Sequence, residues 1–138
     1  MFVREIMHKN VDVINYNKSV QEAAEMMARG NYGALPVEKD DKMIGMITDR
    51  DIALRVVAGK KEAGSTKVAD CMTSGIEYCF DDEDVKVLAN KMKTSQRHRI
   101  PVVNREKRLV GIVSSKDLAT NAKDKELTQD TFAKIYKD

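Results

Sequence analysis

Apolar residues with helical spacing occur twice along the chain, about 65 positions apart. The first set is Val20, Ala23, Ala24 and Met27, and the second is Val85, Leu88, Ala89 and Met92. Both sets fall at i, i+3, i+4 and i+7, which predicts one buried face on each of two helices. Ser19 precedes the first set as an N-cap, with Glu22 completing a capping box, and Asp84 caps the second. Gly30 is expected to end the first helix as its C′ residue.

The segments around each helix also repeat in the same order. An extended stretch precedes the helix, and a strand with a Pro-Val step, a polar turn, a second apolar strand and a short helix follow it. In the first copy these segments are 11–15, 34–37, 39–42, 43–47 and 49–57, and in the second they are 76–80, 100–103, 104–108, 109–113 and 116–121. This order predicts an α+β fold made of two strand–helix–strand–strand–helix repeats.

The repeats divide the chain into four parts. We expect residues 1–60 to form the first repeat, 61–67 a polar linker, 68–121 the second repeat and 122–138 a charged tail. One repeat of about 55 residues buries little apolar surface alone, so the two copies are expected to face each other around one shared core. The apolar residues of the tail predict a short amphipathic helix, and they are Leu127, Phe132, Ile135 and Tyr136.

Composition narrows the class of protein. The chain has 138 residues, of which 42% are hydrophobic and 33% charged, as in soluble globular proteins. Its net charge of +2 is too balanced to predict nucleic-acid binding. Apolar runs are too short for a signal peptide or a membrane span, so the expected location is the cytoplasm. Cys71 and Cys79 form no CxxC pair and no zinc-ligand cluster, so we interpret both as reduced thiols and expect no metal site.

A hydroxyl residue followed three positions later by an aspartate occurs once in each copy, where a strand gives way to a helix. The two boxes are Thr48–Asp51 and Ser114–Asp117. This spacing is also that of a helix capping box, and the two roles can coexist. As a ligand site, the aspartate can accept hydrogen bonds from ribose hydroxyls, while the hydroxyl and the free amides of the helix start can hold a phosphate.

Basic residues adjoin only the second box. Arg97, His98 and Arg99 come just before the second Pro-Val strand, where the first copy has Tyr32-Gly33-Ala34. Arginine binds phosphate through charge-assisted, often bidentate hydrogen bonds. A solvated basic edge is the alternative interpretation. Inside the boxes, Arg50 and Lys116 can partly substitute as phosphate donors. The box with Ser114 and Asp117 is therefore expected to bind a phosphorylated ligand more tightly than the box with Thr48 and Asp51.

The duplicated pattern resembles a known family. GMITDRDI (45–52) and GIVSSKDL (111–118), each after a Pro-Val strand, resemble the paired CBS domains of a Bateman module. The segment 98–103 is similar to the nucleotide-site strand of the γ subunit of AMP-activated protein kinase. The resemblance covers about residues 3–121 and is greatest to small bacterial proteins that consist of this pair. It implies tandem βαββα repeats with pseudo-twofold symmetry, two clefts between the repeats for adenosyl ligands, and a disc-like homodimer.

The resemblance also implies residue roles. In the main site Asp117 would hold ribose, and Ser114, His98, Arg99 and Lys116 would hold phosphate. The adenine pocket of that site would comprise His8, Val11, Asp12, Tyr32 and Gly33. The second site would comprise Thr48, Asp51 and Arg50, with Thr73, Ile76, Glu77 and Arg97 across the cleft.

Three functions remain open at this point. The first is a sensor of AMP, ADP or ATP that signals to an unidentified effector protein, with NAD, S-adenosylmethionine or a dinucleoside polyphosphate as other candidate ligands. The second is a ligand-free dimerisation or interaction module. The third, nucleic-acid binding through the edge 97–99, is opposed by the balanced charge. No enzyme and no catalytic cofactor are expected, because the sequence has no nucleophile–base pair, metal-ligand cluster, Walker A loop or GxGxxG motif.

Overall fold

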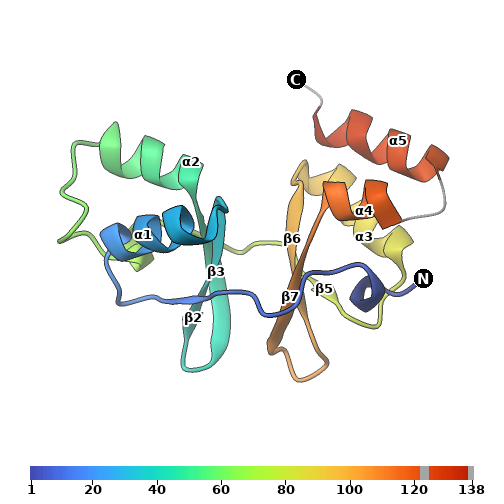
Figure 1. Cartoon of the computed structure of the whole chain (residues 1–138), viewed down its shortest axis with the longest axis horizontal. Coiled ribbons are helices and arrows are strands. Elements are labelled where there is room, and N and C mark those ends of the chain that lie inside the picture. Colours follow the sequence, from blue (N-terminus) through green and yellow to red (C-terminus); the bar gives the residue numbers. More distant parts are fainter. Residues whose placement is uncertain (122–124, 137–138) are drawn as a thin grey trace. The chain divides into compact units, whose positions relative to one another are not determined.

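The computed structural model describes residues 1–121 and 125–136 and divides the chain into two compact units (Figure 1). Unit 2 is one continuous segment, Asp12–Ile76. Unit 1 consists of two segments, Met1–Val11 and Glu77–Asp138. The first eleven residues therefore belong to the unit that contains the second repeat.

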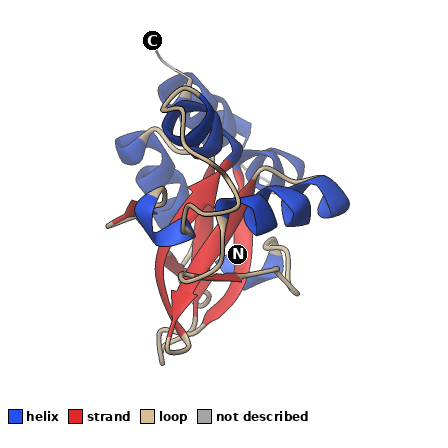
Figure 2. Cartoon of the chain, turned by 90° about the vertical axis from the view of Figure 1, so that its left-hand side faces the viewer, coloured by secondary structure: helices blue, strands red, loops and turns tan. Residues whose placement is uncertain are grey.

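Unit 2 contains a sheet of four strands in the order β1-β2-β3-β4. Its elements are β1 (Ile14–Asn15), α1 (Val20–Gly30), β2 (Ala34–Lys39), β3 (Lys42–Thr48), α2 (Asp49–Asp51), the π-helical η2 (Ile52–Val57), η3 (Val68–Asp70) and β4 (Thr73–Ser74). Strand β1 is parallel to β2, whereas β3 is antiparallel to both β2 and β4. Figure 2 distinguishes the strands from the helices.

Unit 1 contains a sheet of three strands in the order β5-β6-β7. Its elements are η1 (Val3–Glu5), β5 (Cys79–Phe80), α3 (Val85–Ser95), β6 (Arg99–Val103), β7 (Leu109–Ser114), α4 (Ser115–Asn121) and α5 (Lys125–Ile135). The β5–β6 pair is parallel and the β6–β7 pair antiparallel, as in the corresponding strands of unit 2.

Each sheet is extended by a segment that we call an arm: residues 1–11 in unit 1 and residues 68–76 in unit 2. His8 pairs with Ile112 of β7 through two backbone hydrogen bonds of 2.8 and 3.0 Å. Thr73, 65 positions later, pairs with Met46 of β3 in the same antiparallel sense. The arms therefore have equivalent places in the two units.

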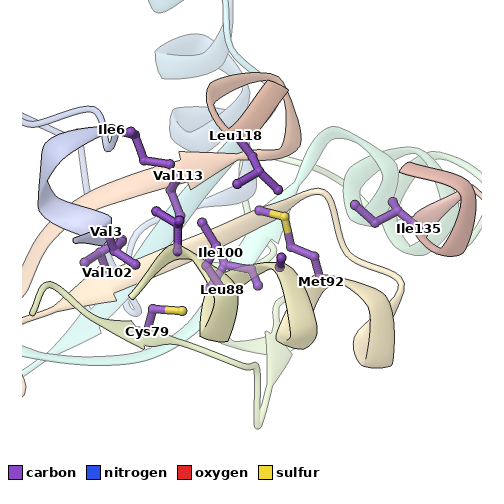
Figure 3. Packing of buried hydrophobic residues seen from close by; sticks show 12 residues of the cluster. Val3, Ile6, Cys79, Leu88, Met92, Ile100, Val102, Val113, Leu118 and Ile135 are labelled. Carbon is purple, nitrogen blue, oxygen red and sulfur yellow. The ribbon is translucent and has the colours of Figure 1, made fainter. Parts of the chain in front are cut away.

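Buried apolar residues form one cluster within each unit. The arms enlarge both clusters, because each adds apolar side chains that the 55-residue repeat lacks. The N-terminal arm contributes Val3 and Ile6 to the cluster of unit 1, and both are labelled in Figure 3. The other arm contributes Val68 and Cys71 to the cluster of unit 2.

The predicted helix starts are confirmed. The amide of Glu22 donates to Ser19 Oγ at 3.2 Å, and the amide of Lys86 donates to Asp84 Oδ1 at 2.9 Å. The prediction for Gly30 is wrong, since it is the last residue of α1 and the left-handed residue is Asn31, with φ 54°. A Cβ at Gly30 would overlap the ring of Tyr32, so a larger residue there would require this ring to move.

The polar segment predicted as a linker lies within unit 2. It supplies acceptors to the first turn of α1, because the amides of Val20 and Gln21 donate to Thr66 O and Ala63 O at 2.8 and 3.1 Å. Cys71 and Cys79 are both buried free thiols, and burial raises the pKa of the Cys79 thiol to about 11.

The C-terminal part of unit 1 is helical over Lys125–Ile135, and this helix, α5, packs on α3 and α4 (Figure 1). Thr131 and Ile135 are buried in these contacts, and Lys93 Nζ of α3 lies 2.7 Å from Asp130 Oδ2. The rest of the predicted tail, 122–124 and 137–138, lies outside the described residues.

Candidate ligand-binding site

The second hydroxyl–aspartate box forms a reciprocal cap between β7 and α4. The amide of Asp117 donates to Ser114 Oγ at 3.1 Å, and the amide of Ser114 donates to Asp117 Oδ2 at 2.8 Å. The other carboxylate oxygen of Asp117 lies 2.8 Å from Nε2 of His8 on the N-terminal arm. Asp117 is buried, whereas the side chain of His8 is 74% exposed. We call Ser114, Asp117 and His8, with the neighbouring His98 and Arg99, the unit 1 site.

The first box has the same geometry. The amide of Asp51 donates to Thr48 Oγ1 at 3.1 Å, and the amide of Thr48 donates to Asp51 Oδ2 at 2.9 Å. The remaining oxygen, Oδ1, accepts from the hydroxyl of Thr73 on the other arm at 3.3 Å. We call Thr48, Asp51 and Thr73 the unit 2 site. In both units the capping interpretation holds, and the second carboxylate oxygen is bonded to an arm side chain.

The backbone amides expected to be free for a phosphate are partly occupied. The amide of Ser115 donates to His98 O at 2.8 Å, and that of Asp117 donates to Ser114 Oγ. In unit 2 the amide of Asp49 donates likewise to Gly33 O at 2.9 Å. Helix α4 is also short, so a phosphate would depend mainly on side chains.

Charges beside the two boxes differ. In unit 1, Arg99 is the register partner of Ser114, and the exposed Lys116 lies inside the box. In unit 2 the place of Ser115 is taken by Asp49, whose carboxylate is so near Gly33 that a Cβ there would lie 2.5 Å from Oδ2. The exposed Arg50 is the only cation within the unit 2 box, and it follows this carboxylate directly.

The residues expected to form the adenine pocket belong partly to unit 1 and partly to unit 2. Val11 is the last residue of the first segment of unit 1, whereas Asp12, Tyr32 and Gly33 belong to unit 2. The phenol of Tyr32 donates to Asp12 Oδ2 at 2.7 Å, and desolvation together with this bond raises the pKa of Tyr32 to about 12. A cavity of about 370 Å³ adjoins the pair, and its lining residues are Asp12, Met26, Arg29, Gly30 and Tyr32.

The remaining residues assigned to the second site also divide. Thr73 and Ile76 belong to the arm of unit 2, whereas Glu77 and Arg97 belong to unit 1. Within unit 2 the structure brings Thr73, but not Ile76, into a hydrogen bond with Asp51 of the box.

The sequence pattern did not indicate the contacts of two residues, Arg55 and Tyr136. Arg55 Nη1 donates to the carbonyls of Cys71 and Met72 at 3.0 and 2.8 Å and so fixes the arm of unit 2. Tyr136, which the sequence indicated only as part of an apolar helix face, lies beside His98 and Ser115. The i, i+4 spacing of Phe132 and Tyr136 was the available signal, but it did not indicate what the ring would contact.

The described part of the chain contains neither a candidate metal site nor a candidate membrane-spanning helix. Residues 1–121 and 125–136 contain no group of three or more His, Cys, Asp or Glu side chains placed to hold a metal ion. None of the helices described is long and apolar enough to cross a membrane.

Together, the duplicated fold and the paired boxes define a module of two βαββα repeats. The model of the CBS domain family matches residues 3–58 and 68–124. The chain therefore belongs to the CBS domain family, and the resemblance inferred from the sequence is confirmed.

Relatives in this family match over most of their length. YhcV of Bacillus subtilis, a CBS domain-containing protein, is 36% identical over 119 residues, which are 86% of this chain and 84% of YhcV. Hypoxic response protein 1 of Mycobacterium tuberculosis is 31% identical over 127 residues, which cover 91% and 88% of the two chains.

Solved structures have the same fold. The crystal structure of Hypoxic Response Protein I with two coordinated zinc ions has a TM-score of 0.80 at 30% identity and covers 88% of this chain and 98% of that one. The CBS domain pair of the protein MJ0100, in complex with 5′-methylthioadenosine and S-adenosyl-L-methionine, has a TM-score of 0.75 at 30% identity, with 87% and 94% covered.

Enzymes match over only a small share of their own length. Homoserine O-acetyltransferase of Methanohalobium evestigatum is 29% identical over 119 residues, which are 86% of this chain but 23% of the enzyme. By contrast, the CBS domain-containing protein YhcV and the solved CBS domain NE2398 match over 84% and 98% of their own lengths. This chain is therefore a regulatory CBS module and not an enzyme.

Proposed function

We propose that this CBS pair senses an adenine nucleotide, such as AMP, ADP or ATP, in the cleft between its repeats and signals to a partner protein. The observation that carries the proposal is the set of basic residues at the unit 1 site: His98, Arg99 and Lys116 beside the box of Ser114 and Asp117. The adenosyl ligands of the MJ0100 pair support the adenosine part of the proposal.

Ribose would bind at the carboxylate of Asp117. One oxygen is committed to the cap, while the other is bonded to the largely exposed imidazole of His8. A ribose hydroxyl can replace this imidazole as donor without breaking the cap. Because Asp117 is buried, a charge-assisted hydrogen bond to it is stronger than one formed in water.

Phosphate would bind beside Ser114. Arg99 is half-buried on β6 next to Ser114, so less of its freedom is lost when it binds an anion. At the unit 2 site the carboxylate of Asp49 would repel a phosphate. We therefore propose that phosphorylated ligands prefer the unit 1 site, while the unit 2 site, with Thr48, Asp51 and Thr73, takes an uncharged adenosyl group or none.

A matched pair of variants tests this proposal. Asp117→Asn and Asp51→Asn each keep an oxygen that can accept the capping amide, but remove the charge that would bind ribose. We expect Asp117→Asn to weaken AMP binding by roughly 10- to 100-fold, the effect of losing one charge-assisted hydrogen bond. Asp51→Asn should change it less than about threefold. Isothermal titration calorimetry measures both.

Equal losses in the two variants would contradict the preference for the unit 1 site. If the protein bound 5′-methylthioadenosine tightly but did not bind AMP, the sensed ligand would be an uncharged adenosyl compound and not a nucleotide. No stabilisation by any adenosyl compound in a thermal-shift assay would refute the sensor function, because a ligand of the folded state must raise its melting temperature.

A dimerisation or interaction module is the second candidate. Leu54 and Val57 of η2 are 52% and 72% exposed, and two apolar side chains on one surface helix favour a protein contact. The two functions are compatible, and we propose a homodimer that presents its state to an effector. The free thiols of Cys71 and Cys79 support a reducing location such as the cytoplasm.

A further inference from the structure

The C-terminal helix places an aromatic ring at the unit 1 site. Tyr136 follows α5 directly, and its ring stacks on that of His98, with the centroids 6.2 Å apart and the planes 30° apart. Its hydroxyl lies 3.3 Å from Oγ of the buried Ser115. Ser115 in turn donates its amide to His98 O at 2.8 Å. Tyr136 thus contacts both the histidine proposed to bind phosphate and the residue next to Ser114.

The place of Tyr136 is set by the packing of α5. Ile135, the preceding residue, is buried in the same apolar cluster as Leu118 of α4. One turn earlier, Thr131 is fully buried, and Asp130 pairs with Lys93 of α3. The ring of Phe132 also contacts Tyr136, with the centroids 5.7 Å apart. Although Tyr136 is 58% exposed, its backbone is therefore held by a docked helix.

We propose that Tyr136 is a positioning residue of the unit 1 site, which orients the imidazole of His98 so that phosphate binds to a preorganised side chain. This inference rests on the proposed function. Stacking on a fixed ring restricts the rotamers of His98 before the ligand arrives, and this lowers the entropy cost of binding.

This device is specific to unit 1. At the corresponding positions unit 2 has Gly33 and Asp49, which offer no ring to stack on and no hydroxyl beside the box. Unit 2 also ends at Ile76, with the arm as its last segment. Helix α5 and Tyr136 thus add to the site that also has the basic residues, and Tyr136 should affect only the binding of the phosphorylated part of a ligand.

The coupling must act in both directions. If docked α5 improves phosphate binding, then bound phosphate stabilises docked α5 by the same factor. A phosphorylated ligand should therefore slow hydrogen exchange in Lys125–Ile135, and α5 would carry the occupancy of the site to a partner. A ligand without phosphate should not do so.

Calorimetric titrations of AMP and of 5′-methylthioadenosine against four proteins test the inference. They are wild type, Tyr136→Ala, Tyr136→Phe and the control Lys134→Ala, which changes an exposed residue of the same helix. We expect Tyr136→Ala to weaken AMP binding by about 3- to 10-fold, the range of an aromatic pair. Tyr136→Phe should restore most of it, and Lys134→Ala and all titrations with 5′-methylthioadenosine should stay at wild-type values. In a His98→Ala background, Tyr136→Ala should have no further effect on AMP.

Unchanged AMP affinity in Tyr136→Ala would overturn the inference and leave the proposed function standing. The inference would also be overturned if Tyr136→Ala lowered the affinities for AMP and 5′-methylthioadenosine equally, or if it lowered AMP affinity by the same factor in the His98→Ala background as in wild type. In either case α5 would only stabilise the fold. No binding of any adenosyl ligand by the wild type would refute the proposed function, and the inference with it.

Discussion

Two glycines at matching repeat positions allow the arms to reach the sheets. A Cβ on Gly111 would lie 2.6 Å from the carbonyl oxygen of His8, and one on Gly45 would lie 2.5 Å from that of Thr73. Real Cβ atoms do not approach backbone oxygens so closely. These glycines are therefore required for the arm contacts, and through them for the bonds to Asp117 and Asp51.

Replacing one of them should release its arm. We expect Gly111→Ala to lower the free energy of unfolding of unit 1 by about 1–3 kcal/mol, because the arm must move off β7. The control is Gly64→Ala, where the nearest atoms are carboxylate oxygens of the exposed Glu62 at 3.3 Å, which can move away. Chemical denaturation followed by circular dichroism measures both. Equal stability of Gly111→Ala and wild type would show that the arm contact is dispensable.

At this scale the sequence predicted the residues of the boxes but not all of their partners. Ser114 and Asp117 are three positions apart, so their mutual bonds follow from the local pattern. The bond between Asp117 and His8 joins residues 109 positions apart and depends on how the N-terminal arm packs. The resemblance to the family grouped these two residues, whereas the residue pattern alone did not.

Among the elements, α1 and α3 were predictable because caps and apolar spacing are local. The contacts of α5 were not, since its weakly apolar face fits α3 and α4 only once these have folded. One ion pair contributes to this docking, and Lys93 lowers the pKa of Asp130 through the bond between them. The paired carboxylate should make the attachment of α5 sensitive to acid.

The direction of this pH dependence follows from the lowered pKa. A carboxylate with a lower pKa in the folded state stabilises the fold fully above its unfolded value of about 4, and this contribution is lost as the pH falls through the folded pKa. We expect Asp130→Asn to melt below wild type at pH 7, and the difference to shrink steadily as the pH is lowered below about 4. Scanning calorimetry over this pH series measures the difference, with Glu126→Gln on the same helix as the control. A difference that persists at low pH would exclude the ion pair as its source.

For the whole molecule, the repeats and the family were predictable from the sequence. That residues 1–11 belong to the unit with the second repeat was not predictable. The pattern placed residues 1–11 before the first repeat, but Val3 and Ile6 pack in the cluster of unit 1. Nothing local in the sequence indicates this, because the matching residues Val68 and Cys71 precede the second repeat in the same way. The arm that precedes the first repeat therefore packs on the second repeat, and the arm that precedes the second repeat packs on the first.

Deleting residues 1–8 should therefore destabilise unit 1, which contains the second repeat. Burial of Val3 and Ile6 contributes on the order of 3–6 kcal/mol, which is much of the stability of a small domain. We expect amides of β6 and β7 to lose most of their protection in hydrogen-exchange mass spectrometry, while those of β2 and β3 keep theirs. Loss of protection in β2 and β3 alone would contradict the assignment of this arm to unit 1.

The exchange of arms also affects the order in which the protein can assemble on the ribosome. Residues 12–76 are complete as soon as they have emerged, so this half can fold while synthesis continues. The first eleven residues are made earlier, but their partners in residues 81–85, β7 and α4 all belong to the second repeat and are translated later. If the gene were divided between the repeats, residues 1–11 would be made without the second repeat on which they pack. The two repeats could therefore not each be encoded as a separate protein with a complete arm.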